Sequence, residues 1–373
     1  MHCLVSLSRI QHKMSTSETS YWRVDFLLVL YVGILHLSNT KGDIQPLIPG
    51  IMVFGDSIVT VGNNNHLSTV VQSNFPPYGR DFMNQLPTGR FCNGKLALDF
   101  TCENLGLPKY PPEILNKELA KGENLLVGAN FASGGSGYYE TTARLYNTIP
   151  LSKQVEYYKE YQIKLVDVAG SSNATSIITG SIYLVSAGTS DFVQNYYVNP
   201  FLYEVYTPYQ FSDILIRAYS HFIQELYRLG ARKIGVSTLP PIGCLPASIT
   251  IFGKGCNECV TKMNSVAQYF NKKLNATSNI LKAKLTGLNI AVLNIYKPLY
   301  NLVLKPNDFG FFEARKACCG TGLLETSFLC NEKSPGTCAN ATGYIFWDGF
   351  HPSEATNKIL ANELLLDAIS LLS

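Results

Sequence analysis

The run Ile51–Ser57, with the sequence IMVFGDS, decides the fold class of this chain. Its first four residues are apolar, and a short apolar run that ends at a glycine indicates a strand buried on both faces. Gly55 then allows a sharp turn, because it has no side chain to obstruct the backbone. Parallel α/β proteins bind their ligands at the carboxyl ends of such strands. The run therefore predicts an α/β protein whose chemistry lies just after its strands.

Four similar apolar runs follow along the chain, with amphipathic stretches between them. The further strands are expected at 125–127, 182–185, 234–236 and 290–293. The clearest helix is expected at 211–229, where apolar residues recur at helical spacing and Gly230 can cap the end. Other helices are expected at 261–285 and 354–366. Strands this apolar, alternating with helices, predict a parallel sheet that is covered on both faces.

The overall composition excludes some partners. The chain has 373 residues, of which 46% are hydrophobic, so it can bury a sizeable core. Only 15% are charged, and the net charge is +3. Its lysines and arginines are scattered and form no basic patch, so we expect no nucleic-acid partner.

The N-terminal region has the pattern of a targeting segment. The apolar run Phe26–Leu37 is too short to span a bilayer comfortably, and small and polar residues follow it up to Gly42. This pattern predicts a signal peptide at 1–42, with Met14 as an alternative start, and one domain at 43–373. An uncleaved anchor is the alternative interpretation. No later segment is apolar for long enough to span a bilayer, so we expect a secreted, extracellular protein without stable membrane insertion.

Two further features suit an exported protein. Three N-x-[ST] sequons, at Asn173, Asn275 and Asn340, are candidate glycosylation sites. The chain also has ten cysteines, and most lie in its C-terminal half, where an exported chain is expected to form disulfides. Cys256 and Cys259 are spaced like zinc ligands but lack a second pair, so metal binding is the weaker interpretation.

The first strand leads into a motif that carries chemistry. A lone Gly-Asp-Ser more often caps a helix than acts chemically. The whole run 54–65 (FGDSIVTVGNNN), however, resembles the first block of the GDSL esterase/lipase (SGNH hydrolase) family, in its secreted plant branch. The resemblance implies that Ser57 is a nucleophile whose own N–H also faces the oxyanion. Thr60 departs from the family's Asp, which puts the local support of this turn in doubt.

Two later blocks resemble the family's oxyanion hole. The run 130–137 (NFASGGSG) follows the second strand, and Gly135 is expected to supply a backbone N–H, with Gly134 as the alternative. A plain glycine-rich turn would have the same composition. The run 188–191 (GTSD) resembles the family's G-x-N-D block, but Ser190 replaces the Asn donor. Losing one oxyanion donor typically costs ~10²–10³ in kcat, so the replacement predicts a weaker or more selective esterase.

A fourth block lies near the C-terminus. Asp348 and His351 are spaced so that the carboxylate can orient the imidazole, which then takes the proton of Ser57. This run matches the family's D-x-x-H block without a departure. The remaining histidines after the leader, His66 and His221, are expected in a loop and in a structural position on a helix. The resemblance thus implies a catalytic triad of Ser57, Asp348 and His351.

The resemblance covers nearly the whole domain. It includes the segments 74–79 (NFPPYG), 88–91 (TGRF), 243–246 (GCLP) and 317–320 (ACCG). It implies a three-layer α/β/α sandwich with a flavodoxin-like parallel sheet.

Four cysteines just ahead of Asp348 are expected to brace the loop that carries it. Four cysteines allow three connectivities, and we expect Cys318 to pair with Cys338 and Cys319 with Cys330. Three other cysteines have no counterpart in the family pattern and are the candidates for a free thiol: Cys92, Cys102 and Cys259.

The segment 192–211 is unusually rich in tyrosine and phenylalanine. Because it follows the third block, it should lie beside the active site. It either lines an acyl or aromatic pocket or packs as a loop over a helix, since both have this composition.

The resemblance implies a carboxylic ester hydrolase that works through an acyl-enzyme on Ser57, without a metal or an organic cofactor. An acyltransferase with the same triad is an alternative, in which an alcohol replaces water. A non-catalytic lipid- or carbohydrate-binding protein of the same fold is another. The expected substrates are small-molecule or surface lipid esters, and the sequence does not choose among acyl chain lengths.

Overall fold

The structure, a computed structural model, describes residues 46–372, so the expected signal peptide lies outside the described residues. A five-stranded parallel sheet forms its centre. The strands are β1 (Ile51–Gly55), β2 (Gly128–Asn130), β3 (Ile182–Ser186), β4 (Lys233–Ser237) and β5 (Asn289–Leu293). Their order, β2-β1-β3-β4-β5, is the flavodoxin-like order. The expected parallel α/β sheet is confirmed.

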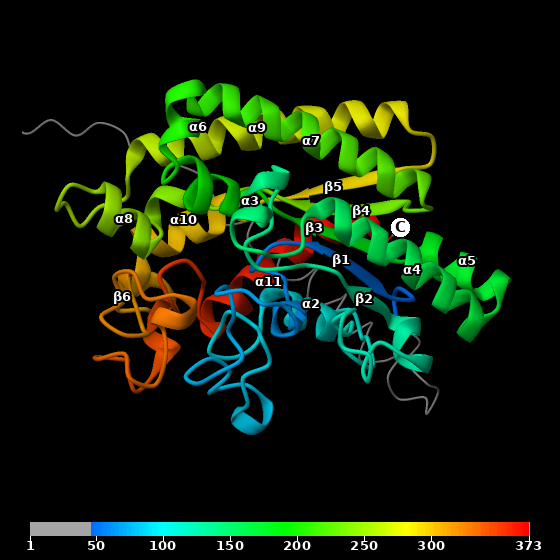
Figure 1. The fold of residues 1–373 in the computed structure, drawn as a ribbon, viewed down its shortest axis with the longest axis horizontal. Helices are drawn as coiled ribbons and strands as arrows, with labels where there is room; N and C mark the ends of the chain where they lie inside the picture. The colour runs from blue at the N-terminus through cyan, green and yellow to red at the C-terminus, as the bar shows by residue number, and fades with distance from the viewer. Residues whose placement is uncertain (1–45, 373) are drawn as a thin grey trace, which may run out of the picture. The chain divides into compact units, whose positions relative to one another are not determined.

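Helices cover both faces of this sheet, because each strand is apolar on both sides. Met52 and Phe54 point into one core, and Ile51 and Val53 point into another, as the two-residue period of a strand requires. The helices over the first core are α4 (Leu151–Ala169), α7 (Pro208–Arg228) and α9 (Thr261–Lys284). Those over the second are α2 (Ala97–Asn104) and α11 (Glu354–Ala368). Figure 1 shows these two groups on opposite sides of the sheet.

The second strand starts later than the sequence predicts. Gly122–Val127 forms a 3-10 helix, and pairing with β1 begins at Gly128, opposite Ile51. Leu125 and Val127 are nevertheless buried. The apolar run at 125–127 therefore indicated burial correctly, but the prediction of a strand there was wrong. Burial alone does not distinguish a helix from a strand.

The longest predicted helices are present. Helix α7 begins before the expected residue 211, because Thr207 and Gln210 form a capping box and Pro208 occupies the first turn. Gly230 lies just beyond its end, with a φ of 105°. The remaining α-helices are α3 (Glu140–Leu145), α5 (Ser171–Gly180), α6 (Pro200–Val205), α8 (Pro246–Phe252) and α10 (Tyr296–Leu304). Within residues 46–372, no helix is both long and apolar enough to cross a bilayer.

A second, smaller sheet carries the C-terminal block. Its strands, β6 (Glu313–Ala317) and β7 (Tyr344–Phe346), pair in parallel. Neither strand was predicted from the sequence, because β6 reads EARKA and lacks an apolar run, and β7 has only three residues. Since β7 ends two residues before Asp348, this sheet determines where the D-x-x-H block begins.

Candidate active site

Ser57 lies in a turn that is fixed from both sides. Gly55 has a φ of +137°, and a Cβ there would lie 1.8 Å from the carbonyl oxygen of Ser186. The Asp56 N–H donates to that same oxygen over 2.9 Å. On the other side, the Gln154 side chain accepts from the Gly55 N–H and donates to the Gly55 carbonyl, both over 2.9 Å. This buried amide, which the sequence analysis missed, anchors the end of β1.

The structure brings Ser57, His351 and Asp348 into one chain of hydrogen bonds. His351 Nε2 lies 2.7 Å from Ser57 Oγ. On the other side of the ring, His351 Nδ1 lies 2.7 and 2.8 Å from the two carboxylate oxygens of Asp348. Ser57 is 6% exposed, His351 is 3% exposed and Asp348 is fully buried. A hydroxyl, an imidazole and a carboxylate in this order can activate a nucleophile.

Three further donors, besides the His351 ring, surround the carboxylate of Asp348. The Phe350 and His351 N–H groups donate to Oδ1 over 2.9 Å each, and Tyr78 Oη donates to Oδ2 over 2.7 Å. Burial alone would raise the pKa of Asp348, but the nearby His351 ring and these hydrogen bonds outweigh it and lower the pKa. Asp348 is therefore a carboxylate at neutral pH.

Residues far away in the sequence pack against this group. The Phe91 ring lies 4.9 Å from the His351 ring, centroid to centroid, and Tyr78 packs edge-on against Phe91 and Trp347. Both come from the segments 74–79 and 88–91, which the sequence analysis noted but to which it assigned no chemistry. The signal that could have found them is an aromatic or phenolic residue in each segment.

Two backbone N–H groups near Ser57 have no partner. Within residues 46–372, neither the Ser57 nor the Gly135 N–H donates a hydrogen bond. The Gly134 N–H, in contrast, donates to Asn64 Oδ1 over 2.8 Å. Gly135 also has a left-handed φ of +79°. These contacts favour Gly135 over Gly134 as a donor to an oxyanion, because only an unused N–H can bind one.

The glycine-rich turn rests on the polar residues that follow Ser57. Asn64 Oδ1 also accepts from the Ser133 hydroxyl, and its Nδ2 donates to the Gly134 carbonyl. Asn63 and Thr60 both donate to the carbonyl of Ala132, and the Thr60 bond is 2.8 Å long. Thr60 thus gives direct support where the family has an Asp.

Ser190 is buried at the start of a π-helix, Asp191–Tyr196. The next residue, Asp191, accepts from the N–H groups of Tyr138 and Tyr139 and from the Thr142 hydroxyl. Burial raises the pKa of Asp191 to about 7, and burial likewise raises the pKa of Asp56 to about 7. A π-helix beside a candidate donor suits a functional position, since such turns recur at functional sites.

Three disulfides are present in the described chain. Cys318 is joined to Cys338, Cys319 to Cys330 and Cys244 to Cys259. The expectation that Cys259 is a candidate for the free thiol was therefore wrong. The free cysteines are Cys92, Cys102 and Cys256, and only Cys256 is exposed. Because Cys259 is bonded to Cys244, it is not available to form a metal-binding pair with Cys256.

A narrow cavity of about 20 Å³ lies at the carboxyl ends of β3 and β4. It has room for a group about as large as one water molecule. Ser57 and His351 do not line it themselves, but their neighbours in the sequence do: Ile58 follows Ser57, and Phe350 and Pro352 flank His351. Leu245 and Leu299 add an apolar wall.

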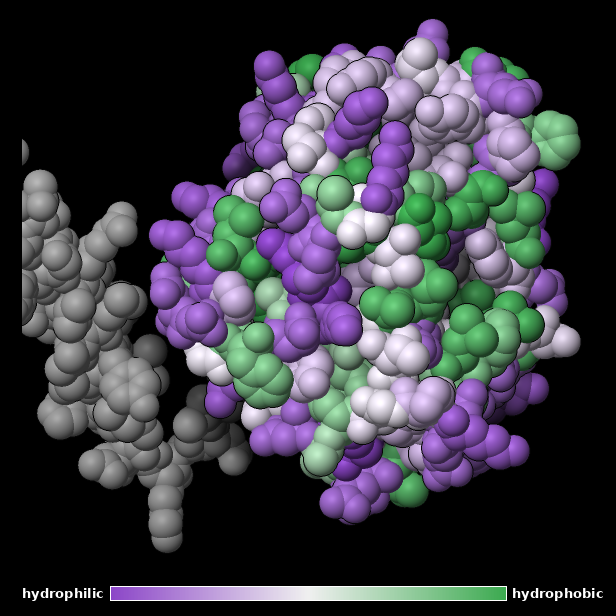
Figure 2. Space-filling view, turned by 90° about the vertical axis from the view of Figure 1, so that its left-hand side faces the viewer, coloured by the Kyte–Doolittle hydropathy of each residue, from purple (hydrophilic) through white to green (hydrophobic). Residues whose placement is uncertain are grey.

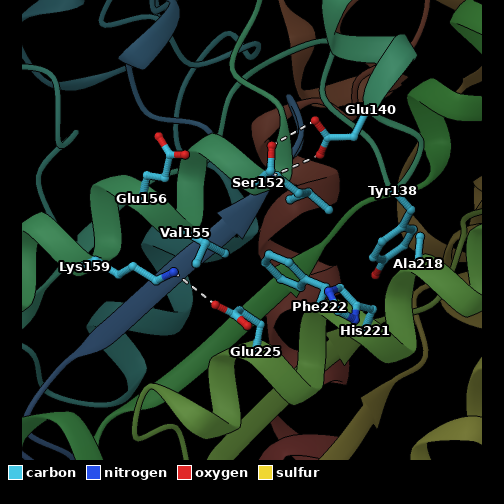
Figure 3. A pocket seen from close by; sticks show the side chains of 11 residues that line it. Tyr138, Glu140, Ser152, Val155, Glu156, Lys159, Ala218, His221, Phe222 and Glu225 are labelled. Atoms are coloured by element: carbon cyan, nitrogen blue, oxygen red, sulfur yellow. Dashed lines mark hydrogen bonds and ion pairs between the residues drawn. The ribbon is translucent and has the colours of Figure 1, made fainter.

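A larger cavity of about 430 Å³ lies elsewhere, between α4 and α7 (Figure 3). His221 lines this cavity, but neither Ser57, Asp348 and His351 nor any residue next to them in the sequence does. Figure 3 shows two of its carboxylates engaged by other groups: Glu140 accepts from Ser152, and Glu225 pairs with Lys159. Its size alone therefore does not make it the reaction site.

The aromatic segment 192–211 serves two purposes. Phe192, Tyr196 and Phe211 are fully buried and pack against one another, as in a covering loop: Tyr196 stacks on Phe211, and Phe192 meets both rings edge-on. Tyr203 and Tyr209 are exposed and line a groove of about 580 Å³. The covering-loop interpretation is therefore confirmed for the buried rings, and the interpretation as an acyl pocket stays a prediction.

The surface near the C-terminal block is partly apolar. Figure 2 looks onto the side of the molecule that carries α8 and β6, and shows hydrophobic side chains gathered across the middle of this face. The exposed apolar residues of the loop between Cys319 and Cys330 are Leu323, Leu324, Phe328 and Leu329. The three sequon residues, Asn173, Asn275 and Asn340, are also exposed.

An α/β sandwich with this Ser–His–Asp arrangement belongs to the broad class of hydrolases. More narrowly, the chain belongs to the GDSL-like lipase/acylhydrolase family, whose model matches residues 51–364. It is 62% identical to the GDSL esterase/lipase At5g22810 of Arabidopsis thaliana, over 88% of this chain and 91% of that protein. It is 56% identical to the GDSL esterase/lipase APG of the same plant, over 93% and 98%. The expected family is confirmed, and with it a carboxylic ester hydrolase.

Proposed function

We propose that Ser57, His351 and Asp348 hydrolyse carboxylic esters through an acyl-enzyme. The observation that carries this proposal is the 2.7 Å contact between Ser57 Oγ and His351 Nε2. His351 takes the proton of Ser57 as Oγ attacks the ester carbonyl, and it then passes that proton to the leaving alcohol. Water, activated by His351, releases the acid. Asp348 orients the ring and stabilises its charged form.

The developing oxyanion is held by the end of the sheet. The unpartnered N–H groups of Ser57 and Gly135 supply two donors, and the Ser190 hydroxyl supplies a third. Such donors act strongly in a site that excludes water, and the burial of Ser57 and His351 supports this.

The substrate is an ester with a short acyl group. The narrow cavity beside Ile58, Phe350 and Pro352 supports this assignment, because it has little room beyond one small group. The alcohol part then extends over the exposed apolar residues Leu323 and Leu324, which suits an apolar alcohol or a lipid surface.

The protein is secreted and N-glycosylated. The apolar run Phe26–Leu37 supports a signal peptide, and the three disulfides suit an oxidising compartment. Asn173, Asn275 and Asn340 are exposed, as glycosylation requires.

The test is hydrolysis of p-nitrophenyl esters of graded chain length by the full chain, by Ser57→Ala and by Ser278→Ala. Removing the nucleophile should lower kcat by roughly 10⁴-fold or more. Ser278 is buried in α9 and hydrogen-bonded to Tyr219, so its variant controls for the loss of a buried hydroxyl. Activity should fall as the acyl chain lengthens. A folded Ser57→Ala that keeps wild-type turnover contradicts the proposal.

A further inference from the structure

Tyr78 extends the hydrogen-bond chain beyond Asp348. Its hydroxyl is within 2.7 Å of Asp348 Oδ2 and accepts from the Ser327 N–H over 2.8 Å. A phenol has a single proton to donate. The Ser327 N–H donates to the phenol oxygen, and an ionised carboxylate can only accept, so the phenol proton is directed to Asp348.

We propose that Tyr78 is a positioning residue that fixes the orientation and the charge of Asp348, and that the disulfide-closed loop 319–330 holds Tyr78 in place. The inference rests on the proposed function, because it assumes that Asp348 orients His351 during ester hydrolysis. Tyr78 touches neither the substrate nor the reacting atoms, so it acts through Asp348.

Burial makes this contact strong. Tyr78 is 1% exposed and Asp348 is fully buried, so no water competes for the bond. Burial, and then the negative charge of Asp348, raise the pKa of Tyr78 well above its usual range. The phenol therefore stays neutral and keeps its proton to donate at neutral pH. Hydrogen bonds to an ionised group are worth roughly twice those between neutral groups.

Ser327 is held for this contact at a cost in backbone strain. It has a left-handed φ of 51°, which a residue with a side chain rarely adopts. Its hydroxyl lies within hydrogen-bond distance of the carbonyls of Val70 and Gln72, which share its single proton, and it accepts from the Gln72 N–H. Strained residues of this kind persist only where their surroundings over-determine them, and they cluster at functional sites.

The loop that presents Ser327 is closed by the Cys319–Cys330 disulfide. The same loop contacts the D-x-x-H turn directly, since the Gly349 N–H donates to the Glu325 carbonyl over 2.8 Å. The loop therefore contacts the Asp348–His351 turn at two points. It reaches the carboxylate through Tyr78, and it binds the backbone between the two residues through the carbonyl of Glu325.

Tyr78 also reduces the effective negative charge of the Asp348 carboxylate. Its hydrogen bond partly neutralises the negative charge of the carboxylate, and this charge stabilises the protonated form of His351. Without the phenol proton, Asp348 would hold a proton on His351 more tightly. The other ionisable groups facing the cluster are Asp56, from the turn after β1, and Arg80, whose guanidinium lies over the Trp347 ring. Neither changes in a Tyr78 variant.

Tyr78→Phe in the full chain tests this inference, with Ser57-dependent ester hydrolysis measured across pH. We expect kcat/KM to fall by roughly tenfold to a hundredfold, mainly in kcat, since one charge-assisted hydrogen bond is lost. We also expect the acid limb of the pH profile to move to higher pH. A purely structural role for Tyr78 would lower activity equally at all pH values and would leave that limb in place.

The matched control is Tyr161→Phe. Tyr161 is also fully buried, and its hydroxyl donates to the Leu125 carbonyl over 2.8 Å, away from the active site. It should lose similar thermal stability and keep its pH profile. An unmoved acid limb in Tyr78→Phe, or an equal loss of kcat/KM in Tyr161→Phe, overturns the inference. The same assay with Ser57→Ala reports separately on the proposed function.

The double variant Cys319→Ser/Cys330→Ser, assayed across pH in the same way, tests whether the closed loop holds Tyr78 in place. If the loop sets Tyr78, this variant shifts the acid limb in the same direction as Tyr78→Phe, by a smaller amount. A folded double variant with an unshifted limb overturns the role of the loop and leaves the role of Tyr78 standing.

Discussion

The proposed active site has two halves that are built differently. Ser57, Gly135 and Ser190 each follow a strand of the parallel sheet, so regular hydrogen bonding between neighbouring strands places them. Asp348 and His351 lie on an irregular turn, held by disulfides, a phenol and a stacked ring. The comparison shows that the nucleophile starts from regular strand pairing, to which buried amides such as Gln154 add support, whereas the base depends entirely on contacts from distant segments.

The largest effect in the loop half should come from Asp348→Asn. The amide keeps the shape of the side chain but cannot stabilise a charged imidazole, so kcat should fall by roughly 10³–10⁴-fold. The measurement is kcat for ester hydrolysis by the purified variant and by the wild type. The two proteins should first be shown to have equal thermal stability. A loss of kcat as small as that expected for Tyr78→Phe would mean that the Asp348 carboxylate contributes no more to catalysis than the Tyr78 hydrogen bond does. That outcome would contradict the view that the base depends on Asp348.

Ser190→Asn tests the sheet half and should raise activity. The longer amide can reach an oxyanion that a hydroxyl meets poorly, and one well-placed donor is worth roughly 10²–10³ in kcat. We expect a gain toward the lower end, because Ser190 is buried and the larger side chain must be accommodated. The kcat on one short ester, with KM measured alongside, decides the outcome. Unchanged or lower turnover contradicts the prediction.

The smallest effect should appear in stability. Burial raises the pKa of Asp191 from an ordinary value of ~3.9 to about 7. Between these values the folded chain keeps a proton that the unfolded chain has released, so stability falls as pH rises through this range. Wild type should therefore melt at a higher temperature at pH ~5 than at pH ~8.

Asp191→Asn removes this carboxyl and should narrow the difference in Tm between the two conditions. Asp56 acts in the same direction, so the difference should shrink rather than vanish. The exposed Asp308→Asn serves as the control and should leave it unchanged. A larger difference in Tm between the two pH values in Asp191→Asn than in wild type would contradict the prediction.

The same division explains what the sequence could predict. Four of the five main strands were recognisable because a strand buried on both faces needs a local apolar run. The strand at 125–127 was misplaced because burial alone did not distinguish it from a helix. Strand β6 was missed because its residues are mostly charged or small. The contacts of Tyr78, Gln154 and Asn64 were beyond prediction, since each joins segments that only the folded chain brings together.

The distance along the chain between the two halves has a consequence for synthesis. Ser57 and His351 are 294 positions apart, near opposite ends of the domain. A ribosome therefore produces the nucleophile long before its base, and a nascent or prematurely terminated chain that stops short of β7 carries a serine without a proton acceptor. If the proposed triad acts as described, the protein gains esterase activity only after the segment that follows β7 has been translated and folded.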